Sequence, residues 1–139
     1  MIYFRGFLLV MVLVGFSQCA SVSSKTVDAT WGEKVVVAYG ETLNLPEGLG
    51  TVTFDQLVYD NRCPFDAQCI TQGSAKVAFS HVPTAGSKMT LEFVIGDNPE
   101  QVHEFDAYRV RLVSLSPLPR TGQRPDPVKY ELELQVEQK

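Results

Sequence analysis

The sequence has little that would support a recognised catalytic motif or binding to nucleic acid. It has 139 residues with two histidines, three cysteines and a formal net charge of −4. It contains no HExxH pair, no GxSxG serine and no glycine-rich phosphate loop. A mildly acidic chain without a basic cluster binds nucleic acid poorly, because neutralised phosphates supply most of that affinity. We therefore expect a protein that is not an enzyme, has no cofactor and binds no nucleic acid.

Long segments with apolar residues at helical spacing are also missing. Apolar and polar residues instead alternate in short segments, which are separated by turns containing glycine or proline. The clearest segment is the last, in which one face is predicted to carry Val128, Tyr130, Leu132, Leu134 and Val136. About seven or eight such segments predict an all-β fold, a small antiparallel β-sandwich or barrel.

Two details of the strand pattern are specific enough to test. Within 51–59, Val52 and Phe54 share one parity, whereas Leu57 and Tyr59 have the other. A strand changes parity through an inserted residue, so we predict a β-bulge near Asp55 and Gln56. Earlier in the chain, the segments 34–39 and 42–45 are predicted to form a hairpin around a turn at Gly40 and Glu41.

Long hydrophobic runs are absent except near the N-terminus. One basic residue, Arg5, precedes the eleven-residue run 6–16, and small polar residues follow it. This order is typical of a secretory signal peptide, and the run is shorter than the roughly 20 residues of a membrane-spanning helix. We expect a signal peptide at 1–20, with Cys19 either lipidated or removed, a tether at 21–32 and a single β domain at 33–139. The predicted location is extracytoplasmic: the periplasm, the cell envelope or the surrounding medium, with a membrane anchor if Cys19 carries lipid.

The scarcity of cysteine identifies one pair. Because Cys19 is acylated or removed in either case, Cys63 and Cys69 are the only pair that can form an intramolecular disulfide, which an oxidising compartment favours. Closing so short a loop stabilises a fold by roughly 2.4 kcal/mol in the chain-entropy description. Two cysteines without a nearby histidine make only half of a zinc site.

The loop around this pair, residues 61–73, is the first candidate binding site, and we call it the clipped loop. Its candidate residues are Arg62, Phe65, Asp66 and Gln68, with Phe65 to Gln68 forming a rigid tip that is offered to a partner. In the alternative interpretation, Asp60 and Arg62 only hold the backbone of the loop. A calcium site at Asp60, Asn61 and Asp66 is a further interpretation, although the spacing matches no EF-hand.

The second candidate is the proline-rich loop, residues 117–127. It has four prolines, which favour an extended backbone, and two arginines, Arg120 and Arg124. Loops of this length are often functional, and guanidinium groups recognise carboxylates. The loop is therefore either a site for an acidic partner or a stiff crossover between two sheets.

The segment Asp60-Asn61-Arg62-Cys63-Pro64, followed by Cys69 and Gly73, resembles a group of small bacterial exported proteins and lipoproteins. In that group an Asp-Ser/Asn-Arg-Cys-Pro segment precedes a second cysteine and a Trp-x-Gly-like stretch. Here Thr71 stands where the tryptophan is usual. The similarity extends from Thr51 to the C-terminus, and it implies a small β fold and an extracytoplasmic location but no particular activity.

Three functional hypotheses follow from these observations. The first is a non-catalytic exported β-domain protein that binds a macromolecular partner, an unknown protein or envelope component, through the clipped loop. The second is an inhibitor of an extracellular enzyme that acts through the same loop. The third is a metal-binding protein or an enzyme without a recognised motif.

Overall fold

The all-β fold expected from the alternating pattern is confirmed. A computed structural model describes residues 25–96 and 101–139, so the predicted signal peptide and Cys19 lie outside the described residues. Within these ranges there is no α-helix, and no helix is long and apolar enough to cross a membrane. The strands are β1 (Thr26–Asp28), β2 (Lys34–Ala38), β3 (Thr42–Asn44), β4 (Gly50–Asp60), β5 (Ala75–Pro83), β6 (Met89–Ile95), β7 (Val102–Glu104), β8 (Tyr108–Ser116) and β9 (Glu131–Gln138). Two short 3-10 turns, η1 (Pro46–Gly48) and η2 (Pro127–Lys129), interrupt this series.

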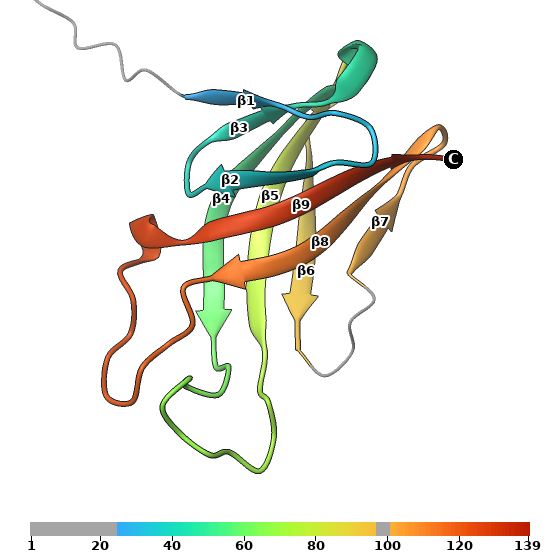
Figure 1. The fold of residues 1–139 in the computed structure, drawn as a ribbon. Coiled ribbons are helices and arrows are strands. Elements are labelled where there is room, and N and C mark those ends of the chain that lie inside the picture. The colour runs from blue at the N-terminus through green and yellow to red at the C-terminus, as the bar shows by residue number, and fades with distance from the viewer. Residues whose placement is uncertain (1–24, 97–100) are drawn as a thin grey trace, which may run out of the picture.

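The strands form two sheets that pack as a sandwich and do not close into a barrel (Figure 1). One sheet has the order β1-β3-β4-β5-β6, and the other has the order β2-β9-β8-β7. All neighbouring strands are antiparallel except β1 and β3, which are parallel. The two loops that follow β4 and β8 lie at the same end of the sandwich (Figure 1).

The core lies between the sheets and is made by the predicted alternation. Each strand turns every second side chain inward, which puts a row of apolar groups on one face of each sheet. The most deeply buried of these are Leu43, Val52, Phe54, Val77, Phe79, Val110, Leu132, Leu134 and Val136. Phe79 links two further aromatic rings, since its centroid lies 5.6 Å from that of Phe54 and 5.2 Å from that of Phe93.

The predicted bulge in β4 is confirmed. Phe54 pairs with Phe79 and Gln56 pairs with Ala78, so Asp55 is the inserted residue. A second shift occurs at Val58, so the end of β4 is bent twice before the clipped loop begins. Bulges increase the local twist of a strand, and these two change the direction in which β4 enters the loop.

The segment expected as a tether contributes to the sheets instead. Residues 21–24 lie outside the described range, but β1 pairs with β3 and Trp31 forms an isolated bridge with Val136. The β domain therefore begins before residue 33. The physical reason is that Val27 and Trp31, although flanked by polar residues, pack against the core.

The predicted hairpin of 34–39 and 42–45 is wrong. β2 pairs with β9 in one sheet, whereas β3 pairs with β1 and β4 in the other. Gly40 has a φ of +78°, and Glu41 accepts a hydrogen bond from the Ala38 N–H at 2.9 Å. This tight turn crosses from one sheet to the other, so Gly40 and Glu41 link the two layers of the sandwich.

Val128 also departs from the prediction. Pro127 begins η2, and the Asp126 side chain accepts a hydrogen bond from the Val128 N–H at 3.2 Å. Residue 128 therefore precedes the strand, and its side chain is 62% exposed. The predicted inward face of the last segment is confirmed from Tyr130 to Val136.

The contrast between Leu132 and Val128 is testable. Leu132 is fully buried, so Leu132→Ala should lower the free energy of unfolding by about 2–5 kcal/mol. Val128→Ala, at an exposed position of the same predicted face, should change it by less than about 0.5 kcal/mol. Urea denaturation followed by circular dichroism measures both values. Equal losses for the two variants would contradict the assignment of Val128 to the turn before β9.

Candidate functional site

The clipped loop is closed by the predicted disulfide between Cys63 and Cys69, whose Cα atoms lie 5.9 Å apart. Its two ends are joined by backbone hydrogen bonds, from Asn61 N–H to Ser74 C=O and from Cys63 N–H to Gln72 C=O, both 2.7 Å. Gly73 has a φ of +69°, and a Cβ atom there would lie 2.0 Å from the Asn61 carbonyl oxygen. Only glycine fits this close approach, so Gly73 fixes the base of the loop.

A buried ion pair stands where β4 passes into the clipped loop. The Arg62 guanidinium donates to both carboxylate oxygens of Asp60, from Nε at 2.8 Å and from Nη2 at 2.7 Å. The side chains of Arg62 and Asp60 are only 9% and 6% exposed. The Arg62 N–H also donates to Asp60 Oδ1 at 3.1 Å, which forms an Asx-type turn.

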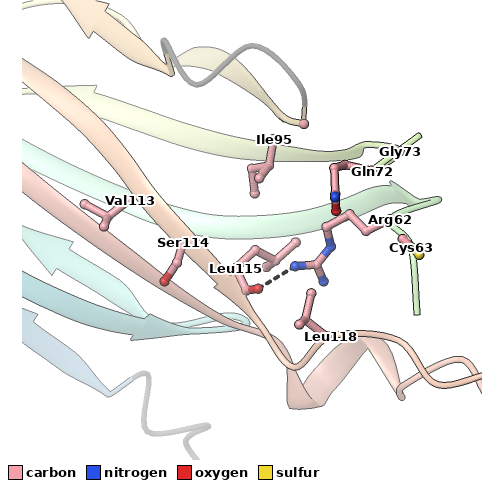
Figure 2. A pocket seen from close by; sticks show the side chains of 10 residues that line it. Arg62, Cys63, Gln72, Gly73, Ile95, Val113, Ser114, Leu115 and Leu118 are labelled. Atoms are coloured by element: carbon pink, nitrogen blue, oxygen red, sulfur yellow. Dashed lines mark hydrogen bonds between the residues drawn. The ribbon is translucent and has the colours of Figure 1, made fainter. Parts of the chain in front are cut away.

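The same guanidinium connects the loop to the opposite sheet. Arg62 Nη1 donates to the Leu115 carbonyl at the end of β8, and Nη2 donates to the Pro117 carbonyl at 2.8 Å. Figure 2 shows Arg62 extending toward Leu115, with the bond between them dashed. From the start of β9, the Tyr130 hydroxyl donates to Asp60 Oδ2 at 2.8 Å. The Asp60–Arg62 pair therefore joins one sheet to the other at this end of the sandwich.

The electrostatics of this cluster favour an ionised Asp60. Burial raises the pKa of Asp60, but hydrogen bonds from Arg62 and Tyr130 outweigh that effect and hold it below its ordinary value. Burial and the adjacent Asp60 carboxylate raise the pKa of Tyr130 to about 12. Tyr130 therefore remains a neutral donor, and Asp60 remains an anionic acceptor, across the physiological range.

The clipped loop and the proline-rich loop contact each other. The Phe65 N–H donates to the Pro119 carbonyl at 3.1 Å. Asp66 Oδ1 accepts from the backbone N–H and the hydroxyl of Thr121, at 2.9 and 3.0 Å. The Arg120 guanidinium lies 4.7 Å from the centroid of the Phe65 ring, within the range of a cation–π contact. We call the two loops together the double loop.

The double loop carries large apolar side chains in water. Ile70 is fully exposed, Phe65 is 55% exposed and Leu118 is 49% exposed. Gln68 is exposed as well. The disulfide and the hydrogen bonds between the loops hold the backbone around these side chains. The exposed side chains therefore belong to an ordered surface. Exposed apolar groups of this kind mark interaction sites when they gather in one region.

Two hollows lie on either side of Arg62. The first, about 440 Å³, lies toward the gap between the sheets and is lined by apolar side chains, including Ile95, Val113, Leu115 and Leu118 (Figure 2). The second, about 460 Å³, lies between the two loops and is lined by Arg62, Arg120, Arg124 and two prolines. We call this second hollow the cationic cleft.

Both histidines contribute to the sandwich. His81 is buried, with Nδ1 3.1 Å from the Thr51 carbonyl oxygen and Nε2 3.0 Å from the Tyr108 hydroxyl. His103 Nε2 lies 3.0 Å from the carbonyl oxygen of Glu92, which belongs to β6. Across residues 25–96 and 101–139, no three side chains of the metal-ligating types are grouped to hold an ion. At the calcium site considered above, the Asp60 and Asp66 oxygens accept the internal hydrogen bonds already described.

The sequence predicted both loops as candidate sites, but the structure gives some of their residues a different role. Arg62 was a candidate binding residue, yet its donors are used inside the chain, which favours the interpretation that it holds the loop. Asp66 is partly used by Thr121, whereas Phe65, Gln68, Arg120 and Arg124 face solvent. The exposed Ile70 was not among the predicted site residues, although an isoleucine in a polar loop indicates an exposed apolar side chain. No sequence pattern indicates the roles of Tyr130 and Thr121.

Comparison of the chain with family models, with curated proteins and with solved structures found no match.

The Asp60–Arg62 pair can be tested by removing one charge. Asp60→Asn leaves a buried guanidinium without its counter-ion, so the free energy of unfolding at pH 7 should fall by about 3–5 kcal/mol. Asp106→Asn, in the exposed turn before β8, is the matched control and should change it by less than about 0.5 kcal/mol. Urea denaturation at pH 7 gives both values, and similar effects for the two variants would argue against the pair.

The effect of Asp60→Asn should also depend on pH. Because the folded-state pKa of Asp60 is lowered, its ionised form stabilises the fold above the ordinary pKa of 3.8. That stabilisation is lost as the pH falls through the lowered folded-state pKa. The stability difference between wild type and variant should therefore be complete at pH 7 and shrink below about pH 4. A difference that stays constant from pH 7 to pH 2 is the contrary result.

Proposed function

We propose that this chain is a non-catalytic exported β-domain protein that binds another protein of the cell envelope or the extracellular space through the double loop. The observation that carries the proposal is the exposure of Phe65, Ile70 and Leu118 on two loops that hydrogen bonds and a disulfide hold in one arrangement. A surface that is ordered before binding loses less conformational entropy when a partner docks. Aromatic and arginine side chains, such as Phe65 and Arg120, are also enriched at the energetic centres of protein interfaces.

The proposed location follows the same line of argument. The disulfide between Cys63 and Cys69 is compatible with an oxidising compartment outside the cytosol. We propose that residues 1–20 direct export and that Cys19 is either lipidated, which would anchor the domain to a membrane, or removed. The proposed kinship with small bacterial exported proteins and lipoproteins, carried by residues 60–64, Cys69 and Gly73, agrees with this location.

The contacts of the loop tip favour this proposal over the inhibitor alternative. An inhibitor that enters an enzyme cleft needs Phe65 to Gln68 to project as a free segment. Phe65 and Asp66 are instead held against the proline-rich loop by the Pro119, Thr121 and Arg120 contacts. This arrangement supports docking on a broad surface formed by both loops.

Ile70 provides the test of the proposed function. The exported chain is immobilised, and proteins of the envelope and extracellular fractions from cells that produce it are captured and then purified. With the purified partner, Ile70→Ser should weaken binding by about 10–100-fold, because burying such a side chain contributes about 1.5–3 kcal/mol. Val36→Ser, at an exposed position of β2, is the matched control and should leave the dissociation constant unchanged.

Three results would oppose the proposal. Val36→Ser weakening binding while Ile70→Ser does not would place the interface on the β2 side of the sandwich. Equal losses for both variants would indicate general adhesion, and no capture from either fraction would remove the support for a partner protein. Calorimetric titration and circular dichroism of the variants separate lost binding from lost folding.

A further inference from the structure

Both arginines of the proline-rich loop lack a salt bridge among the residues that the structure describes. Eleven lysines and arginines lie at positions 25–96 and 101–139, and seven of them form a salt bridge within those ranges. The four that form no salt bridge with another described residue are Lys88, Arg120, Arg124 and Lys129. Three of these four belong to the proline-rich loop or to η2 directly after it. In an acidic chain, this concentration of unpaired cations calls for an anionic partner.

The nearby acidic side chains are already occupied. Asp60 is neutralised by Arg62, and Asp126 caps η2 by accepting from the Val128 N–H. Asp66 accepts from Thr121, and the Thr121 N–H is the largest cause of its lowered pKa, while the Arg120 charge is the smallest. Asp66 therefore offsets the charge of Arg120 only weakly. Of the three guanidinium groups that line the cationic cleft, those of Arg120 and Arg124 form no salt bridge with a described residue and can attract an external anion.

The backbone fixes the two arginines at the ends of one turn. Arg120 and Gln123 exchange backbone hydrogen bonds, at 3.3 Å and 3.0 Å. Gly122 has a φ of +74° and so supplies the left-handed residue of this turn. Arg124 follows the turn directly and precedes Pro125, while Arg120 rests on the Phe65 ring. Both arginines line the cationic cleft, and a single guanidinium can bind the two oxygens of a carboxylate through paired hydrogen bonds.

We propose that the cationic cleft binds a carboxylate side chain, Asp or Glu, on the surface of the partner protein, with Arg120 and Arg124 as the recognition residues. This inference rests on the proposed function and specifies the chemistry of its partner. A polysulfated chain or an anionic membrane is disfavoured, because this region offers only Arg120, Arg124 and Lys129 as cations without a salt bridge to a described residue. The rest of the chain would repel such a polyanion, since the formal net charge is −4. The prolines that line the cleft and the exposed Phe65 ring against Arg120 suit a carboxylate that is flanked by apolar groups.

The test uses a blocked Glu–Glu–Glu tripeptide as probe, so it requires no identified partner. Nuclear magnetic resonance follows the side-chain Nε–Hε signals of Arg120 and Arg124 in the exported chain during the titration. We expect saturable shifts of both signals and a loss of at least tenfold in affinity for Arg120→Gln combined with Arg124→Gln. Arg124→Gln alone, which removes no salt bridge among the described residues, should weaken binding by about threefold to tenfold, roughly 1 kcal/mol. Lys88→Gln, at the unpaired cation that lies outside both loops and η2, is the matched control and should leave the affinity unchanged.

Four outcomes would overturn the inference. They are an absence of shifts, equal shifts with a blocked Gln–Gln–Gln tripeptide, tighter binding of inorganic sulfate than of the Glu tripeptide, and binding to vesicles that contain anionic lipid with no response to the peptide. The tripeptide can fail to bind although a partner protein is captured and Ile70→Ser weakens its binding. That result would support the proposed function and contradict only the recognition of a carboxylate. The reverse result, a carboxylate site without a captured protein, would oppose the proposed function alone.

Discussion

The buried ion pair of Asp60 and Arg62 is the interaction on which the arrangement of the double loop depends. It lies at the end of β4, and the same guanidinium reaches the carbonyl groups of Leu115 and Pro117 in the chain that leaves β8. Tyr130 completes the cluster from the start of β9. One cluster thus connects the two sheets where the sandwich is open. Buried ion pairs often add little net stability, because desolvation opposes the attraction, so we assign this pair a positioning role.

The disulfide and the ion pair act at different ranges. The disulfide joins residues six apart, so it restricts the shape of the clipped loop without setting the direction in which the loop points. Arg62 instead bonds groups that lie 53 and 55 positions away, and Asp66 bonds Thr121 at a separation of 55. The covalent link therefore shapes the loop, and the polar contacts place it against the proline-rich loop. Binding through either loop alone would use only part of this surface.

The sequence predicted the features that arise from local patterns. Alternation revealed the all-β class and the β4 bulge, and the cysteine count identified the disulfide. It could not assign β2 and β3 to different sheets, because a tight turn at Gly40 looks the same in a hairpin and in a crossing between layers. The alternating pattern also did not show that Pro127 begins a 3-10 turn, so that the last strand begins only at Glu131. Val128 was therefore predicted to point inward.

The candidate site also has features that local sequence patterns predict and features that depend on the tertiary structure. The two loops were recognisable from cysteine, proline and arginine content, but their contact was not, because carbonyl acceptors such as those of Leu115 and Pro117 have no residue signature. Arg62 consequently looked like a binding residue, although its donors serve the fold. Which arginines of the two loops form no salt bridge with another described residue, Arg124 and not Arg62, can be identified only once the tertiary structure is known.

The most direct test of the central claim is amide hydrogen exchange at Phe65 and Thr121, whose N–H groups donate across the two loops. The double replacement of Asp60 by Asn and Arg62 by Met removes the ion pair without leaving an unpaired buried charge. If the pair holds the loops together, both amides should exchange faster by a similar factor, while the Leu132 amide in β9 keeps its wild-type rate after correction for global stability. Unchanged protection at Phe65 and Thr121 would contradict the account.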